Sequence, residues 1–245
     1  MARAKRLIAV GVVALVLGLI ATFPARIAYQ WFAPEELALS GISGSIWNGA
    51  ATQVSAGGLY LSELTWRFRP LSLFSLKAGY AISGRLPSGF VESDIAFGPG
   101  GRVYLDDLAT AIPLAYFDPL LPLTGIEGDV SVQFRRLAFA GGFPVSADGS
   151  VSISGLVLRA LAPSALGDFR AVFQTNDGVI SAVVEDASGV LDVNGNLVLQ
   201  SDRTYSFVGQ VAPNANAPAA VVEQLRFLGS PDQQGRREFR FEGSL

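Results

Sequence analysis

The sequence contains no histidine and no cysteine among its 245 residues. Without histidine there is no imidazole general base, no Ser-His or Cys-His pair and no histidine metal ligand. Without cysteine there are no thiol nucleophiles, disulfides, thiolate zinc sites or iron–sulfur clusters. These two absences exclude much of known enzyme chemistry before any motif is considered.

Charge is also sparse. Charged residues make up 16% of the chain, against roughly 25% in an average soluble protein. The residues after Ala25 carry 15 basic and 21 acidic side chains, a net charge of −6, and Lys77 is their only lysine. No basic patch or stripe is present, so we expect no nucleic-acid partner.

The N-terminus has the pattern of a membrane anchor. Arg3, Lys5 and Arg6 precede an uncharged run from Leu7 to Ala25. A spanning helix needs about 20 apolar residues, so the run qualifies, and the positive-inside rule places residues 1–6 in the cytoplasm. The alternative is a cleavable signal peptide, but the sequence has no convincing A-x-A-like cleavage site.

We therefore predict a single transmembrane helix over residues 7–25 and an exported domain over residues 26–245. Tyr29, Trp31 and Phe32 follow the predicted helix directly. Aromatic side chains are enriched where membrane helices meet water, so these three are candidates for an interfacial anchor.

The exported part alternates apolar and polar residues with a period of two, which predicts β-strands. Val130, Val132 and Phe134 share one face of such a strand. Turns are expected at Asn176-Asp177-Gly178, a hairpin signal, and at Asp148-Gly149 and Asp202-Arg203. Asn194-Gly195 fits either a hairpin or a bulge within one strand.

Two short helices are expected in this mainly β domain. Asp106 to Ile112 places Leu108 and Ile112 four residues apart before Pro113, and Ala217 to Leu228 has one apolar face and ends at Gly229 and Pro231. The strands predict one curved antiparallel sheet or groove, or two stacked repeats with a boundary near residues 105–124. The apolar face of such a sheet either packs as a core or holds acyl chains or a partner strand.

No catalytic, cofactor or metal site is expected, and we predict that the chain is not an enzyme. Lys77 lies in a strand pattern without a surrounding motif. The carboxylate pairs Asp106-Asp107 and Glu185-Asp186 fit a helix start and a turn. The segment Asp192 to Asn196 imitates the opening of a calcium loop, but Arg203 occupies the twelfth position, where glutamate is needed.

Several segments in the same order resemble protein N of the bacterial type II secretion system, the GspN family. The first is Gly41-x-x-Gly44-x-x-Trp47-x-Gly49, followed by LTWRFRPLSL with Trp66 and Pro70. The others are LGDF at 166–169, SGVLDVNGNLVL at 188–199, and the closing stretch 227–245.

This resemblance implies an accessory, single-pass inner-membrane protein with a periplasmic domain that contacts other secretion components. It carries over no catalytic residues. The architecture is also similar to that of AsmA-type envelope proteins, whose β-groove is proposed to pass lipids, so phospholipid is the alternative partner. The candidate structural or contact positions are Gly44, Trp47, Gly49, Trp66, Phe90, Gly229 and Pro231.

Overall fold

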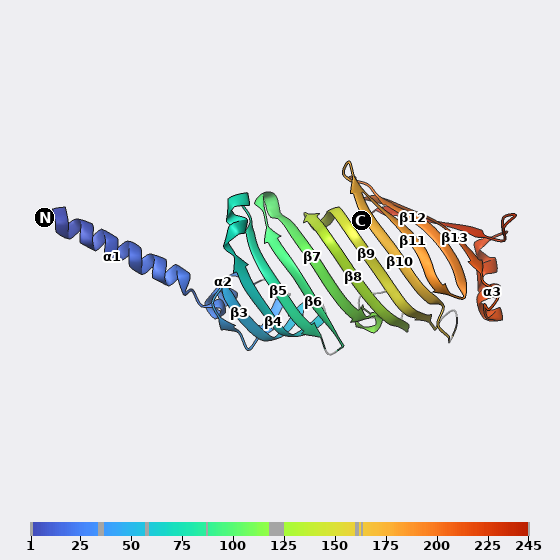
Figure 1. Ribbon diagram of the computed structural model, residues 1–245, viewed down its shortest axis with the longest axis horizontal. Coiled ribbons are helices and arrows are strands. Elements are labelled where there is room, and N and C mark those ends of the chain that lie inside the picture. Colours follow the sequence, from blue (N-terminus) through green and yellow to red (C-terminus); the bar gives the residue numbers. More distant parts are fainter. Residues whose placement is uncertain are drawn as a thin grey trace.

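A computed structural model describes residues 2–33, 37–56, 59–86, 88–117, 125–159, 162 and 164–244. The chain begins with α1 (Ala2–Ala21), which projects from one end of a long sheet (Figure 1). Pro24 interrupts the helix, and a second, short helix α2 (Ala25–Phe32) follows at once. In the described part of the chain, no helix is both long enough and apolar enough to cross a membrane. The anchor expected over residues 7–25 stays a prediction.

The rest of the chain forms one antiparallel sheet of 14 strands, in which nearly every strand pairs with its neighbours in sequence. Only β2 lies off this path, pairing with β3. The strands are β1 (Leu37–Ser40), β2 (Ser43–Gly44), β3 (Asn48–Ala56), β4 (Leu59–Arg69), β5 (Ala78–Leu86), β6 (Gly89–Phe97), β7 (Arg102–Pro113), β8 (Ile126–Ala140), β9 (Phe143–Leu158), β10 (Gly167–Asn176), β11 (Val179–Gly189), β12 (Leu191–Leu199), β13 (Thr204–Pro213) and β14 (Arg237–Ser244).

Short helical elements punctuate the sheet at its ends and turns. They are the 3₁₀ turns η1 (Pro70–Ser75), η2 (Pro99–Gly101) and η3 (Leu114–Phe117), the helix α3 (Ala219–Leu225) and its continuation η4 (Arg226–Leu228). The helix expected over Ala217 to Leu228 is therefore confirmed as α3 and η4. Gly229 follows η4 with a φ of 104°, a conformation that favours glycine.

The helix expected over Asp106 to Ile112 is wrong, because these residues lie within β7. Leu108 and Ile112 are an even number of residues apart, so they share a strand face as readily as a helix face. Pairing of β7 with β6 and β8 on both sides decides for the strand. That pairing also joins the two halves into one sheet rather than two stacked repeats. Residues 118–124 of the expected boundary lie outside the described residues.

The turn predictions have mixed outcomes. Asp177 and Gly178 form the hairpin between β10 and β11 with φ of 49° and 79°, as a type I′ turn requires. Asp202-Arg203 also lies in the turn between β12 and β13. The turn expected at Asp148-Gly149 is wrong, because both residues lie inside β9. Asn194-Gly195 is the uninterrupted interior of β12, neither hairpin nor bulge.

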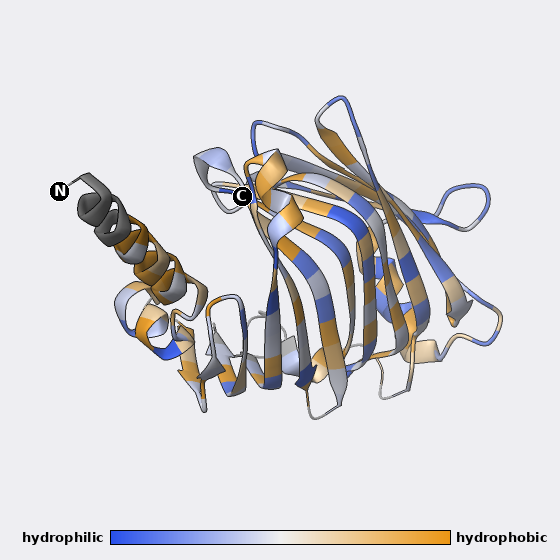
Figure 2. Ribbon diagram, turned by 60° about the vertical axis from the view of Figure 1, so that its left-hand side comes forward, coloured by the Kyte–Doolittle hydropathy of each residue, from blue (hydrophilic) through white to orange (hydrophobic). Residues whose placement is uncertain are grey.

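The sheet has one apolar and one polar face, visible as alternating colours along the strands (Figure 2). Phe134, Phe173 and Ala182 lie in register on the apolar face, whereas Gln133 and Ser150 pair on the other. The sheet curves along its length into an open trough (Figures 1 and 2). Register shifts in several strand pairs accompany this curvature, since bulges bend strands and increase their twist.

Among the described residues, the α-helices α2 and α3 cover the two ends of the apolar face. At the first end Ala25 of α2 packs with Ile42, Ala51 and Val54. At the other end α3 packs on strands β12 and β13, in a buried cluster that contains Leu166, Leu191, Val211, Val221 and Leu225. The sheet therefore has two helix-capped ends with a long middle section between them.

Candidate functional site

The middle of the apolar face is the first candidate site. Its core cluster is made of strand residues alone, with Phe134, Ala147 and Ile180 buried at the centre. The aromatic rings of Phe134 and Phe173 lie 5.5 Å apart across the strands. Side chains around them, such as Leu108 and Val151, are only half-buried. An apolar surface of this kind suits an apolar ligand or chain.

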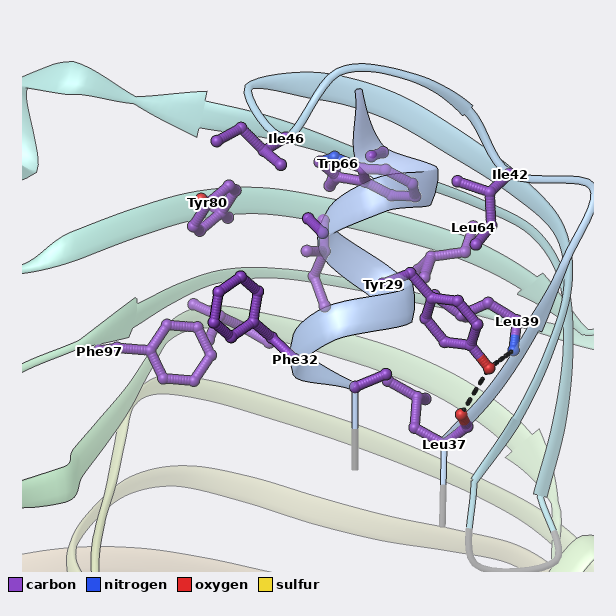
Figure 3. A pocket seen from close by; sticks show the side chains of 15 residues that line it. Tyr29, Phe32, Leu37, Leu39, Ile42, Ile46, Leu64, Trp66, Tyr80 and Phe97 are labelled. Carbon is purple, nitrogen blue, oxygen red and sulfur yellow. Dashed lines mark hydrogen bonds between the residues drawn. The ribbon is translucent and has the colours of Figure 1, made fainter. Parts of the chain in front are cut away.

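The second candidate is an apolar pocket between α2 and the first strands (Figure 3). Its volume is about 420 Å³, within the range of small-molecule sites. Its side chains come from α2, β1, the segment leading to β3, and β4 to β6. Those labelled in the figure are Tyr29, Phe32, Leu37, Leu39, Ile42, Ile46, Leu64, Trp66, Tyr80 and Phe97.

The polar atoms of this pocket are mostly engaged within the protein. The Tyr29 hydroxyl donates to the Leu37 carbonyl at 2.9 Å and accepts from the Leu39 amide at 3.1 Å, as drawn in Figure 3. The Trp66 indole N–H donates to the Ser45 carbonyl at 3.1 Å. Burial raises the pKa of Tyr80, so its hydroxyl stays neutral. An uncharged, apolar group is the kind of occupant that fits.

Four of the predicted positions meet beside this pocket. Gly44 has a φ of 81°, and a Cβ there would lie 2.4 Å from the Asn48 carbonyl oxygen. Gly49 lies under the Trp66 ring, where a Cβ would come within 2.5 Å of the indole. The rings of Trp47 and Phe68 meet edge to face, with their centroids 4.7 Å apart.

Both indoles are half-buried and donate their N–H groups to backbone carbonyls, that of Trp47 to Ile20 at 2.7 Å. In this geometry they attach the end of α1 and the first strands to one another. The remaining three predicted positions lie elsewhere. Phe90 is 41% exposed at the start of β6, and Gly229 and Pro231 lie between η4 and β14 at the opposite end of the sheet.

Several carboxylates accept hydrogen bonds within the protein. Asp186 accepts a hydrogen bond from the Val193 amide at 2.7 Å. The pKa of Asp168 is lowered by hydrogen bonds from the Gly155 amide and the Ser188 hydroxyl, and that of Asp202 by bonds from the Thr204 hydroxyl and amide. Among the described residues, no three acidic side chains gather in a way that could hold a metal ion.

Comparison with known proteins adds the decisive observation. Residues 35–240 match the family described as "Type II secretion system (T2SS), protein N". The chain belongs to this family.

Several relatives carry the same description. The type II secretion system protein N of Vibrio cholerae serotype O1 is 29% identical over 231 residues, covering 86% of each chain. The Aeromonas hydrophila protein is 24% identical and again covers 86% of each chain. That of Pectobacterium carotovorum is 23% identical, covering 91% of this chain and 90% of its own. No solved structure matches the chain.

Sequence reasoning missed one prominent surface of this protein N family member. The turn η1 and the residue after it expose Leu71, Leu73, Phe74 and Leu76. The signal was present in the sequence, because large apolar residues at positions 71, 73, 74 and 76 break the period of two between Pro70 and Lys77. Helix α2 was also missed, because Tyr29, Trp31 and Phe32 directly follow the apolar run and were interpreted as an interfacial anchor.

Proposed function

We propose that this chain is an accessory inner-membrane component of the type II secretion system that acts through protein contacts in the periplasm. The observation that carries the proposal is the family match over residues 35–240, together with relatives named for that system. The role is non-enzymatic.

The proposed topology rests on the sequence run from Leu7 to Ala25 after three cations. Within α1, the apolar side chains from Val10 to Ile20 are exposed rather than packed on the sheet. A helix that is apolar and unpacked is suited to lipid surroundings. In this topology the sheet extends from the outer surface of the inner membrane into the periplasm.

Sheet edges provide the proposed contacts. Strand β14 hydrogen-bonds β13 along one side, and no other strand in the described part of the chain pairs with it. The edge runs over eight residues, from Arg237 to Ser244, whereas β1 at the other edge has four. An unpaired edge can accept a partner strand through main-chain hydrogen bonds. β14 is therefore the preferred place for a partner protein.

The test is the secretome of a strain that lacks this gene, measured with outer-membrane permeability in the same cultures and restored by the full chain. We expect loss of secreted exoenzymes with an intact outer membrane. A strain restored by a variant with Asp106, Asp107, Glu185 and Asp186 changed to amides supports the non-enzymatic role. Normal secretion without the gene overturns the proposal.

Topology can be tested separately because the chain is free of cysteine. A single cysteine placed at Ser40 should react with a membrane-impermeant maleimide once the outer membrane is opened. A cysteine at Ala4 should react only after the cells are lysed. Equal labelling of both positions in unlysed cells contradicts the proposed anchor.

A second candidate function is lipid handling along the trough. It is favoured by the uncovered middle of the apolar face and by the pocket under α2. The full chain, extracted in detergent, should then carry phospholipid detectable by mass spectrometry. Ile82→Gln, in the pocket wall, should lose this lipid, while Ser83→Gln on the opposite face keeps it. A leaky envelope with normal secretion in the deletion strain favours this candidate over the first.

A further inference from the structure

The turn between β4 and β5 exposes a compact group of large apolar side chains. Leu71 is 76% exposed, Leu73 55%, Phe74 89% and Leu76 79%. We call these four residues the apolar tip. Single exposed apolar residues are common on protein surfaces, but here four lie within six consecutive positions. Concentrated apolar surface of this kind marks protein or membrane contacts.

The apolar tip is held in shape by local hydrogen bonds from the Ser72 side chain and from the backbone. The Ser72 hydroxyl donates to the Arg69 carbonyl at 2.6 Å and accepts from the Gly79 amide at 2.8 Å. The Leu76 amide donates to the Leu73 carbonyl at 2.9 Å, and the Lys77 amide to Ser72 at 3.1 Å. These bonds fix a turn that presents its apolar side chains outward instead of folding them back onto the sheet.

The apolar tip belongs to the end of the sheet from which α1 projects (Figure 1). The Trp47 indole donates to the Ile20 carbonyl of α1, and its ring meets the Phe68 ring edge to face. Phe68 lies two residues before Pro70, where η1 begins. The Phe68 amide also donates to the Trp47 carbonyl at 2.6 Å. Figure 1 shows α1 leaving the molecule at this same end of the sheet. The surface of a membrane crossed by α1 is therefore within reach of the tip.

The sequence on either side of the apolar tip carries only positive charge, although the exported part is acidic overall. No Asp or Glu occurs between Leu64 and Val91. Arg69 and Lys77 line a pocket together with Leu71 of the tip, and the Lys77 ammonium lies 3.6 Å from the centroid of the Tyr104 ring. Arg67 precedes the tip in β4, and Arg102 is the first residue of β7. The acidic side chains of the same pocket are Asp94, which forms an ion pair with Arg69, and Asp106. Exposed apolar side chains with cations on both sides in the chain match the interface of a bilayer that contains anionic lipid.

We propose that the apolar tip inserts into the periplasmic surface of an anionic bilayer beside the anchor, as a second membrane contact. This inference rests on the proposed inner-membrane anchor. Two contacts, α1 and the apolar tip, hold the first strands against the lipid. The sheet then has a fixed direction relative to the membrane instead of swinging on α1.

The test uses the full chain in nanodiscs, with an environment-sensitive fluorophore on Phe74→Cys as the only cysteine. Phe227→Cys is the matched control, because Phe227 is 85% exposed at the opposite end of the sheet. In discs of phosphatidylethanolamine with phosphatidylglycerol, we expect blue-shifted emission at position 74. Lipid-borne nitroxide should remove most of that emission and leave position 227 unaffected. Lys77→Gln should lower the ratio of quenched to unquenched label at position 74 about fivefold. This is the factor of about five that one cation near an anionic surface contributes to membrane binding.

The outcomes separate the two proposals. If the chain stays with the discs but the label at position 74 remains in water, the second contact is wrong and the anchor stands. An apolar tip that binds a partner protein instead of lipid gives this result. If the chain leaves the disc fraction, both the anchor and the second contact are overturned. Far-UV circular dichroism of each labelled chain verifies that the sheet is intact.

Discussion

At the scale of single residues, close packing and hydrogen-bonded side chains fix how neighbouring strands approach. Gly49 lets the Trp66 ring approach β3 closely, and the Trp66 N–H donates to the Ser45 carbonyl. Asp168 accepts bonds from Gly155 of β9 and Ser188 of β11, on either side of its own strand. A glycine such as Gly49 is hard to replace, because ring and backbone atoms leave no room for a side chain there.

Gly49→Ala should destabilise the first strands by about 1–3 kcal/mol, because the new methyl group overlaps both the Trp66 ring and the Ser43 carbonyl. Urea titration measures this loss as a lower free energy of unfolding. Gly84→Ala is the matched control, since a Cβ there meets only flexible side chains at 3.3 Å or more. Equal losses for both variants would show that the fit beneath the indole is not what restricts position 49.

Stability should also depend on the protonation of Asp168. Its pKa is lowered, first by the Gly155 amide and then by the Ser188 hydroxyl. A carboxyl group whose pKa is lower in the folded than in the unfolded state stabilises the fold. This stabilisation is fully present above the unfolded-state pKa of about 3.9 and is lost as the pH falls through the folded-state pKa. Asp168→Asn should therefore be less stable than the natural chain at neutral pH, and the difference should shrink in acid. Urea midpoints across this pH range measure it, and Ser188→Ala should show a smaller effect of the same sign.

At the scale of elements, the two helices on the apolar face do different work. Helix α3 closes its end of the trough, with Val221 and Leu225 buried against the strands. Helix α2 buries only Ala25 fully, and it leaves Trp31 and Phe32 mostly exposed. Helix α3 therefore completes a core, whereas α2 leaves an apolar pocket and an apolar surface next to α1.

Leu225→Ala should cost about 2–3 kcal/mol, because it removes a buried side chain of α3 from the cluster that covers this end of the sheet. Thermal unfolding followed by far-UV circular dichroism measures the loss. Phe227→Ser, two residues later but 85% exposed, should leave the transition almost unchanged. A similar loss in both variants would contradict the assignment of α3 as the buried element.

At the scale of the whole molecule, the sheet is a meander in which each long strand contacts mainly its neighbours in sequence. Its three buried clusters, at α2, in the middle and at α3, contain different residues. Chains of this kind behave as a row of local units joined by nearest-neighbour interfaces. Their unfolding is not required to be a single all-or-none transition.

The three tryptophans provide a test, since Trp31, Trp47 and Trp66 all lie in the first quarter or so of the chain. Tryptophan fluorescence therefore reports the α2 end, while far-UV circular dichroism reports every strand. The two signals should give different urea midpoints. Leu225→Ala should move the circular dichroism transition and leave the fluorescence transition in place. Coincident midpoints in both chains would instead indicate one cooperative unit.

The sequence by itself determined the features that depend on local spacing. Alternation of period two gave the strands, Asn176-Asp177-Gly178 gave a hairpin, and the segment from Ala217 to Leu228 gave the final helix. The missing histidine and cysteine restricted the chemistry in the same direct way. Each of these follows from residues close together in the chain, so no knowledge of the fold was needed.

Only the tertiary structure decided which elements the ambiguous segments form and what covers them. Leu108 and Ile112 fit a helix face and a strand face equally well, and pairing with β6 and β8 made the segment a strand. The exposure of Phe74 and the open middle of the apolar face likewise depend on what lies opposite in space. Local spacing carries no information on such contacts, because the curvature of the sheet and the positions of α2 and α3 set them.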